Sequence, residues 1–409
     1  GGSVAILGHQ KLVGSKIEPI VESLLASGKM DWEKIQSQFL IPPELTVLNA
    51  ANLCPSPAHV LETVTNYTQR LDSKPVPSYR AEMIAVKEKT RQELAKYLRA
   101  TPEEILITRN TSESNNWVSN GLDLKEGDEV VIFSDNHPSN NEAWKERGKR
   151  FGFKIIEVPP LNPHPGFDYY IEAFKKALTP RTRVLAFTHL SNTVGDLFPA
   201  KELCIMARER GVISLIDGAQ SFGLLDVDLS NIKPDFYSGS AHKWPCGPKE
   251  TGVLFVNKSI QEHFWPSIYS AYKGSEGLAQ THEGLGQRDT PAIYAFGKQI
   301  EFLRKIGQNK IEKRSGDLAT KIIAGLQNIQ GVSVYTSNKR PLRSAVVTFR
   351  PANLDPSKVV KALENDGIVA ANLAGDGWAG VRFSPHFYNS DRDIKRAIDA
   401  IKGYVRKGL

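Results

Sequence analysis

Cysteine is scarce in this chain of 409 residues, which contains only Cys54, Cys204 and Cys246. The three positions form no Cys-x-x-Cys pair and no pairing pattern. We therefore expect neither a disulfide framework nor a metal site. The same scarcity is compatible with the cytoplasm and with the periplasm.

Long apolar runs are absent as well, since no stretch approaches the roughly 18 residues that a membrane-spanning helix needs. We therefore expect no contact with a membrane. The first eight residues are apolar, and no basic residue precedes them. They read either as a cloning remnant or as the end of an export signal whose front is missing. A cytoplasmic location is expected, with periplasmic export as the alternative.

Charge of one sign does not dominate. The 52 basic and 45 acidic residues leave a net charge of +7, and no basic run is interleaved with aromatic residues. A nucleic-acid partner is therefore not expected. A mildly cationic protein suits anionic small molecules.

Between residues 88 and 260, short apolar runs alternate with segments of helical spacing. The expected strands are Ile105–Thr108, Glu129–Ser134, Lys154–Val158, Arg183–Thr188, Val212–Asp217, Asp235–Ser238 and Gly252–Val256. The expected helices include Ser139–Phe151, Asp168–Leu178 and Pro199–Gly211. This alternation predicts an α/β fold whose mostly parallel seven-stranded sheet is covered on both faces.

Polar residues close several of these strands, namely Thr108, Ser134, Thr188 and Asp217. In a parallel sheet the carboxyl ends of the strands meet at one edge, and ligands bind outside that edge. The sequence therefore predicts a ligand site there.

After about residue 305 the pattern changes, and helix-like segments mix with short strand-like ones. They are Lys310–Ile329, Val332–Tyr335, Ser344–Arg350, Pro356–Asp366, Gly380–Ser384 and Asp391–Lys407. This mixture indicates a smaller α+β domain. We expect a large domain at 60–305 and a small domain made of 1–59 and 306–409.

A lysine and an aspartate suggest the chemistry of the site. Lys243 lies in the run Ser-Ala-His-Lys-Trp-Pro-Cys-Gly-Pro at 240–248, and Asp217 ends a buried strand before Gly-Ala-Gln. An amine that forms a Schiff base and a carboxylate that holds a pyridinium nitrogen are what pyridoxal phosphate (PLP) requires of a protein. Taken alone, Lys243 would be interpreted as a solvated surface charge and Asp217 as a loop cap, rather than as catalytic residues.

The run Thr-Arg-Asn-Thr-Ser-Glu-Ser-Asn-Asn at 108–116 follows a strand and opens a helix. Hydroxyl groups and free backbone N–H groups at a helix start form an anion site, which suits a cofactor phosphate. Thr111 and Ser112 are the candidate residues there. Ordinary helix capping by either residue is the alternative.

Further motifs, in the order of the chain, match one enzyme family. They are Ser-Asp-Asn-His-Pro at 134–138 with Trp144 after it, Ser-Asn-Thr-Val-Gly at 191–195, the lysine run, and Arg-Phe-Ser-Pro-His-Phe-Tyr-Asn-Ser at 382–390. Over about residues 45–400 the chain resembles the class V aminotransferase and cysteine desulfurase family of PLP enzymes. The resemblance implies the fold-type I PLP-dependent transferase fold, PLP as cofactor, and a homodimer.

The resemblance also implies roles for individual residues. Lys243 becomes the Schiff-base lysine and proton carrier, Asp217 the partner of the ring nitrogen, and His137 a residue that stacks on the ring. Residues that bind the cofactor would be Thr111, Ser112, Asn192, Gln220, Ser240 and His242. Arg382 would hold the substrate α-carboxylate near Asn192, since a guanidinium pairs with a carboxylate through two hydrogen bonds. Arg80 is a candidate for substrate side-chain recognition, or an ordinary surface arginine.

Two differences between this sequence and the family pattern bear on which reaction is expected. Cysteine desulfurases carry a nucleophilic cysteine about fifteen residues before this arginine, but residues 373–380 contain none. Gln287 stands where the family places a threonine that reaches the partner subunit's cofactor. The Gly-x-Arg-Asp pattern at 286–289 is similar to the isopenicillin N epimerase-like branch.

The sequence therefore predicts a PLP enzyme that acts on an amino acid or amino-acid derivative through an imine and Cα deprotonation, as an epimerase does. A carbon–sulfur β-lyase or an aminotransferase is the alternative. A protein of this fold that binds PLP without catalysis is the non-enzymatic alternative.

Overall fold

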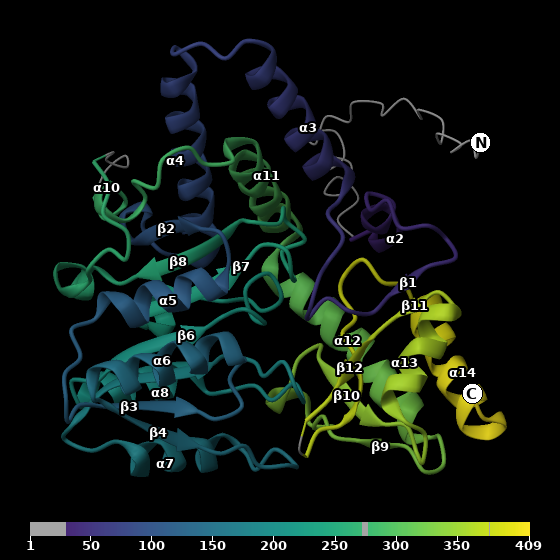
Figure 1. Ribbon diagram of the computed structural model, residues 1–409. Coiled ribbons are helices and arrows are strands. Elements are labelled where there is room, and N and C mark those ends of the chain that lie inside the picture. The colour runs from purple at the N-terminus through teal and green to yellow at the C-terminus, as the bar shows by residue number, and fades with distance from the viewer. Residues whose placement is uncertain (1–29, 272–276, 376) are drawn as a thin grey trace, which may run out of the picture.

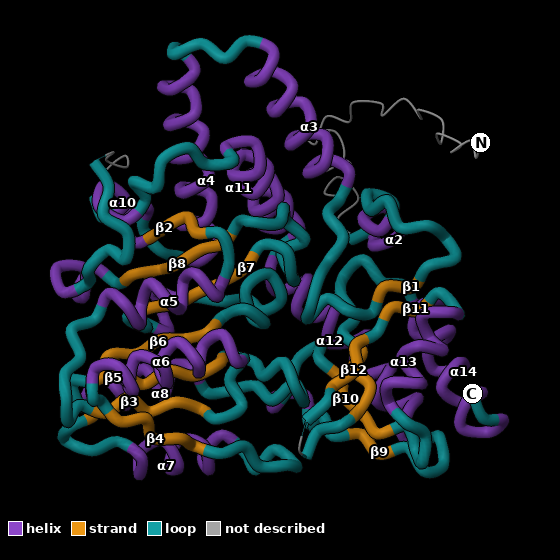
Figure 2. The backbone as a smooth tube through the Cα atoms, viewed as in Figure 1, coloured by secondary structure: helices purple, strands orange, loops and turns teal. Residues whose placement is uncertain are grey.

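The computed structural model describes residues 30–271, 277–375 and 377–409. Two sheets dominate these residues. The larger one lies on the left of Figure 2 and the smaller one on the right, with helices around both.

The large sheet has seven strands in the order β2-β8-β7-β6-β5-β3-β4. They are β2 (Ile105–Thr108), β3 (Glu129–Phe133), β4 (Lys154–Val158), β5 (Thr182–Thr188), β6 (Ile213–Asp217), β7 (Phe236–Ser240) and β8 (Gly252–Val256). β8 is antiparallel to both of its neighbours, and the other neighbouring pairs are parallel. The expected mostly parallel sheet is therefore confirmed.

Alternate residues of these strands face two apolar layers. Ile132 of β3 packs in one layer with Trp144, and Phe133 packs in the other with Phe174. Both faces are covered, which explains why the strands are apolar along their length. The covering helices are α5 (Thr111–Gly121) and α6 (Pro138–Phe151) on one side, and α7 (Phe167–Ala177) and α8 (Ala200–Glu209) on the other.

Three long helices extend beyond the sheet and were not expected from the sequence. α3 (Ala58–Ser73) and α4 (Tyr79–Leu98) form a hairpin that projects at the top of Figure 1, and both contact α11 (Thr290–Ile306). Shorter helices are α2 (Trp32–Gln36), α9 (Leu229–Ile232) and α10 (Ala279–His282), with 3-10 turns at Pro102–Glu104, Lys258–His263 and Arg340–Leu342.

The small sheet is antiparallel, in the order β12-β13-β10-β9. Its strands are β9 (Ser333–Val334), β10 (Val347–Arg350), β12 (Ala371–Leu373) and β13 (Gly380–Phe383). Helices α12 (Gln308–Gln327), α13 (Pro356–Asn365) and α14 (Asp391–Lys407) pack around it. β9 and β10 are shorter than expected, because the backbone N–H groups of Tyr335 and Thr336 both point at the oxygen of Thr348 and the ladder becomes irregular.

The segment before α3 is held by the C-terminal part of the chain. β1 (Thr46–Val47) pairs in parallel with β11 (Ile368–Val369), and Asn49 forms a bridge with Ser384. The grouping of residues 1–59 with 306–409 in one small domain stays a prediction, and residues 1–29 lie outside the described part. The boundaries at 60 and 305 remain a prediction.

Among the described residues, no helix combines the length and the apolarity that a bilayer crossing requires.

Candidate active site

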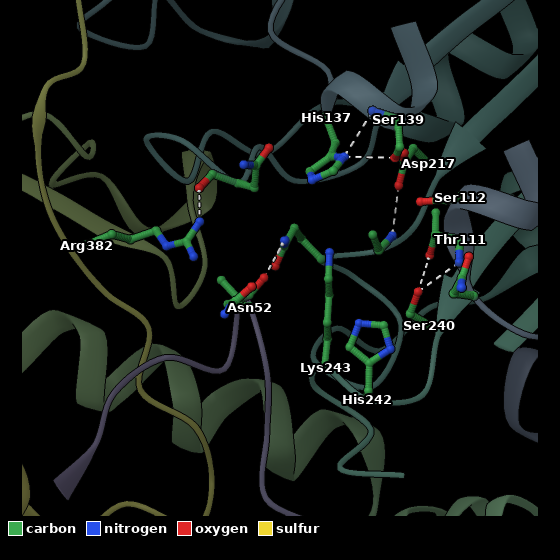
Figure 3. A pocket seen from close by; sticks show the side chains of 15 residues that line it. Asn52, Thr111, Ser112, His137, Ser139, Asp217, Ser240, His242, Lys243 and Arg382 are labelled. Atoms are coloured by element: carbon green, nitrogen blue, oxygen red, sulfur yellow. Dashed lines mark hydrogen bonds between the residues drawn. The ribbon is translucent and has the colours of Figure 1, made fainter. Parts of the chain in front are cut away.

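A cavity of about 280 Å³ lies beside the carboxyl ends of β6 and β7, where residues of the small sheet meet the large one. In Figure 3, Arg382 enters from one side, Thr111, Ser112 and Ser240 lie on the other, and Lys243 stands between them. The cavity is lined by Ala51, Asn52, Asn110, Thr111, Ser112, His137, Ser139, Asn192, Asp217, Ala219, Gln220, Ser240, His242, Lys243 and Arg382.

Lys243 lies in the loop between β7 and β8, and its side chain lines the cavity. Burial lowers the pKa of its amine to about 8. The nearby Asp217 carboxylate opposes this shift, and the Arg382 guanidinium adds to it. A larger share of the lysine is therefore neutral near neutral pH than for a solvated lysine, and a neutral amine is the nucleophilic form.

Asp217, the last residue of β6, is held from two directions. One carboxylate oxygen accepts a hydrogen bond from the backbone N–H of Ala219 at 3.0 Å, and the other accepts one from Nδ2 of Asn115 at 2.9 Å. Asn115 is oriented in turn by the hydroxyl of Ser238, which donates to its Oδ1 at 2.8 Å. The carboxylate is 1% exposed and fixed in direction, as a partner for a ring nitrogen must be.

The N-terminal end of α5 provides a cluster of donors. The backbone N–H of Thr111 donates to Oγ of Ser240 at 2.8 Å, and the two hydroxyls lie 2.7 Å apart. Ser112 lines the cavity one residue further along the helix. Gly252 of β8 permits this arrangement, because a Cβ there would lie 2.9 Å from Cα of Asn110. Positive helix-end charge and hydroxyl groups together suit a phosphate.

His137 precedes the first residue of α6. Its Nδ1 accepts a hydrogen bond from the backbone N–H of Ser139 at 3.2 Å and lies 2.8 Å from the hydroxyl of that residue. Burial lowers the pKa of His137, the charge of Lys243 lowers it further, and Asp217 opposes both. We infer a neutral imidazole with its proton on Nε2.

Gln220 follows β6, and its carboxamide is held at both ends. Nε2 donates to the backbone oxygen of Ala51 at 3.0 Å, and Oε1 accepts from Nε1 of Trp244 at 2.7 Å. His242 lines the cavity beside Lys243, and burial with the charges of Lys243 and Lys249 lowers the pKa of this imidazole to about 4.

Arg382 is a buried guanidinium on β13, with 5% of its surface exposed. Its Nη1 donates to the backbone oxygen of Asn192 at 2.7 Å, and its Nε has no hydrogen-bond partner among the described residues. Burial lowers the pKa of Arg382 to about 10. A buried guanidinium with unused hydrogen-bond donors suits the binding of an anionic ligand.

All the expected site residues except two line this one cavity. Gln287 is exposed in the loop before α11, although its neighbour Arg288 donates to the backbone oxygen of Ile107 at 3.2 Å, near the end of β2. Arg80 is exposed on α4, and neither Arg80 nor Gln287 lines the cavity of its own chain.

Several residues at this site were not predicted from the sequence. Asn115 was detectable in principle, because it lies one helical turn after Thr111 on the same face of α5. Ser139 was detectable as a partner of His137. No motif around Ala51 and Asn52 predicted a place in the site, because they reach the cavity only through pairing of the N-terminal segment with the C-terminal one.

The donor set of the cavity fits pyridoxal phosphate. Helix-end N–H groups and hydroxyls suit its phosphate, the fixed Asp217 carboxylate suits its ring nitrogen, and the Lys243 amine suits its aldehyde. The fold and these side chains together define a PLP-dependent enzyme of fold type I.

Comparison with known proteins identifies the family. The model of the family "Aminotransferase class-V" matches residues 47–397. Isopenicillin N epimerase from Streptomyces clavuligerus is 29% identical over 390 residues, which cover 91% of this chain and 98% of that protein. A probable cysteine desulfurase from Halalkalibacterium halodurans is 30% identical over 380 residues, covering 86% and 90%.

Solved structures share the fold. The apo cysteine desulfurase from Thermococcus onnurineus NA1 has a TM-score of 0.82 at 24% identity and covers 92% of this chain and 98% of its own. The cystine C-S lyase C-DES, in complex with its product cysteine persulfide, has a TM-score of 0.81 at 22% identity and covers 88% and 98%.

The chain therefore belongs to the class V aminotransferase family, whose members are PLP-dependent enzymes. Its relatives include epimerases as well as cysteine desulfurases.

Proposed function

We propose that this protein is a PLP enzyme that removes the α-proton of an amino acid or amino-acid derivative, with epimerisation as its reaction. The observation that carries the proposal is the convergence of Lys243, Asp217 and Arg382 on one cavity. They supply an amine, a carboxylate and a guanidinium, the three groups needed to handle the cofactor aldehyde, the cofactor ring and a substrate carboxylate.

When bound, PLP supplies an aldehyde that condenses with amines and a ring that accepts electrons from the bond broken at Cα. Asp217 keeps a proton on the ring nitrogen. Arg382 holds the substrate carboxylate and thereby orients Cα. The neutral Nζ of Lys243 then takes the proton from Cα. A proton delivered from solvent water to the opposite face of Cα would invert the centre, which is epimerisation, and Nζ of Lys243 would release its proton to solvent.

The cysteines argue against a sulfur-relay reaction on this chain. Cys54, Cys204 and Cys246 are all buried, and none lines the cavity. A nucleophile that must pass sulfur to an acceptor needs an exposed thiolate. This supports epimerisation over a desulfurase mechanism that uses a cysteine.

We also propose a homodimer, because the family resemblance gives Gln287 a role at the partner subunit's cofactor. The exposed position of Gln287 outside its own cavity is compatible with such a role.

The test is proton exchange at Cα. The protein loaded with PLP is incubated in deuterium oxide with a panel of L- and D-amino acids, and substrates and products are analysed by mass spectrometry and chiral chromatography. We expect solvent deuterium at Cα and appearance of the opposite stereoisomer. Lys243→Ala should abolish exchange, whereas Lys249→Ala, an exposed lysine of the same loop, should not.

Other products would redirect the assignment. A 2-oxo acid with aminated cofactor indicates an aminotransferase, and release of the β-substituent as a thiol or persulfide indicates a carbon–sulfur lyase. Bound cofactor with no exchange for any substrate indicates a binding protein. Failure to bind PLP, or an unchanged cofactor spectrum in Lys243→Ala, contradicts the cofactor site itself.

A further inference from the structure

A buried chain of hydrogen bonds runs behind Lys243 and includes the residue that follows it. Trp244 is fully buried, and its Nε1 donates to Oε1 of Gln220 at 2.7 Å. Nε2 of the same carboxamide donates to the backbone oxygen of Ala51 at 3.0 Å. Gln220 itself lines the cavity and is 3% exposed.

These two partners allow only one orientation of the carboxamide. An indole N–H can only donate, and a backbone carbonyl can only accept. A flipped amide would turn its NH₂ group toward the indole N–H and its oxygen toward the oxygen of Ala51. Both hydrogen bonds would be lost, and two buried groups would be left without partners, which is costly in a protein interior. The second hydrogen of Nε2 is the one polar hydrogen of this side chain without a partner among the described residues.

The family resemblance implies that Gln220 contacts the phenolic oxygen of the cofactor. We propose that Trp244 is a positioning residue that fixes the Gln220 carboxamide so that its free Nε2 hydrogen is directed to that oxygen. The inference rests on the proposed function, because it assumes that PLP occupies this cavity. Gln220 is the residue that touches the cofactor, and Trp244 acts only through it.

The C-terminal segment holds Trp244 in place. Nε2 of His386 lies 2.6 Å from the backbone oxygen of Trp244, and Nδ1 of His386 lies 2.9 Å from the hydroxyl of Ser315 on α12. The rings of His386 and Trp244 meet edge to face, with centroids 5.0 Å apart. The orientation of the carboxamide therefore depends on residues from the loop after β7, the segment after β13, and α12.

The direction of the effect follows from the chemistry of the cofactor. A donor to the phenolic oxygen stabilises its anionic form, so loss of the donor makes the bound cofactor keep its proton to a higher pH. The midpoint of the pH-dependent absorption change of bound PLP reports this directly and does not depend on turnover. The titratable groups that face the cavity, which are Lys243, Asp217, His137, His242 and Arg382, stay the same in every variant.

The experiment is a double-mutant cycle on PLP-loaded protein. Gln220→Leu removes the donor, and a hydrogen bond to a charged group corresponds to a rise in the midpoint of about 1–2 pH units. Trp244→Phe should let the carboxamide flip. If the donor then faces the cofactor half of the time, the midpoint rises by about 0.3 pH unit, and a rarer donor gives a larger rise. In the Gln220→Leu background, Trp244→Phe should produce no further shift.

A matched control separates positioning from packing. Trp144 is also fully buried, and its Nε1 donates to Oδ1 of Asn140 at 3.1 Å, but it does not line the cavity. Trp144→Phe should cost comparable stability and leave the midpoint unchanged. If Trp244→Phe does not fold, a tryptophan analogue with sulfur in place of Nε1–H, introduced at position 244, keeps the packing and removes only the donor.

The outcomes of this experiment separate the positioning role of Trp244 from the proposed function as a PLP enzyme. An unchanged midpoint in both position-244 variants, or equal shifts in the presence and absence of Gln220, overturns the role of Trp244 while PLP binding stands. A wild-type protein that shows no absorption from bound PLP overturns the proposed function itself.

Discussion

Replacement of Arg382 by lysine tests how this protein captures its substrate. The guanidinium has one hydrogen bond within the described residues, from Nη1 to Asn192, and its Nε is buried without a partner. A carboxylate can therefore bind through two parallel hydrogen bonds without breaking an existing one. Lysine keeps the charge and loses this paired geometry.

The size of the effect follows from that geometry. A hydrogen bond between charged groups is worth about 1.5–3 kcal/mol, and about 1.36 kcal/mol corresponds to a factor of ten. Arg382→Lys should therefore lower kcat/KM for an amino acid by roughly tenfold to a hundredfold. The spectrum of bound PLP should barely change, because Arg382 is not expected to touch the cofactor before substrate arrives.

Two controls make the result specific. Arg343 is another buried arginine with an unpartnered Nε, and burial lowers its pKa to about 10, but it lies outside the cavity. Arg343→Lys should reduce stability and leave KM unchanged. A primary amine that lacks the carboxylate should react poorly and equally with the wild type and with Arg382→Lys.

Unaltered steady-state kinetics of Arg382→Lys with an amino acid would refute the reasoning. Equal losses for the amino acid and for the amine would refute it as well. The carboxylate would then be held elsewhere, and Arg80 would be the next residue to replace.

Three further predictions concern pH, sulfur and stability. Because burial lowers the pKa of Lys243 to about 8, the rate at which PLP combines with the apoprotein should rise as pH rises through that value; a stopped-flow rate that stays flat across it contradicts the shift. Replacing all three cysteines with alanine should leave Cα exchange largely intact, and loss of activity together with a persulfide adduct in mass spectra would contradict this. Burial would raise the pKa of Glu283, but Arg91 and Lys87 lower it below the usual value. Its ion pair therefore stabilises the fold above the ordinary pKa of glutamate, and this contribution is lost as pH falls through the lowered value. Glu283→Gln should cost about 3–5 kcal/mol in urea unfolding at neutral pH, and a cost below about 1 kcal/mol, the range of an exposed pair, would show that the pair contributes little.

Much of the fold could be predicted because its signals are local. β4, β2 and β8 were expected at the residues where they occur, since each is a short run that alternates with helical segments. The α3–α4 hairpin was not expected, because exposed and buried residues do not follow a clear apolar stripe along α4. That helix becomes mostly buried only in its C-terminal half, where it packs against α11 and β2.

The residues of the site also fall into those that could be predicted from the sequence and those that could not. Residues at strand ends, such as Asp217, could be found because a parallel sheet brings those ends together. The contact between Trp244 and Gln220 could not be found, because it depends on the rotamers of two side chains in separate loops. The wall formed by Ala51 and Asn52 depends on contacts across more than three hundred residues, such as the 3.1 Å hydrogen bond from Ala50 N to the backbone oxygen of Ser384.

That last contact sets an order for assembly on the ribosome. Every strand of the large sheet has left the exit tunnel before β13 is synthesised, so the lysine loop and the Asp217 cradle can form early. Arg382 and the residues that pair with the 46–50 segment, which begin at Gly367, are synthesised only after all of those strands. A nascent chain can therefore form the Lys243 loop and the Asp217 cradle before it can bind a substrate carboxylate or fix the Gln220 carboxamide. A stop just before β13 would leave the first pair of features without the second.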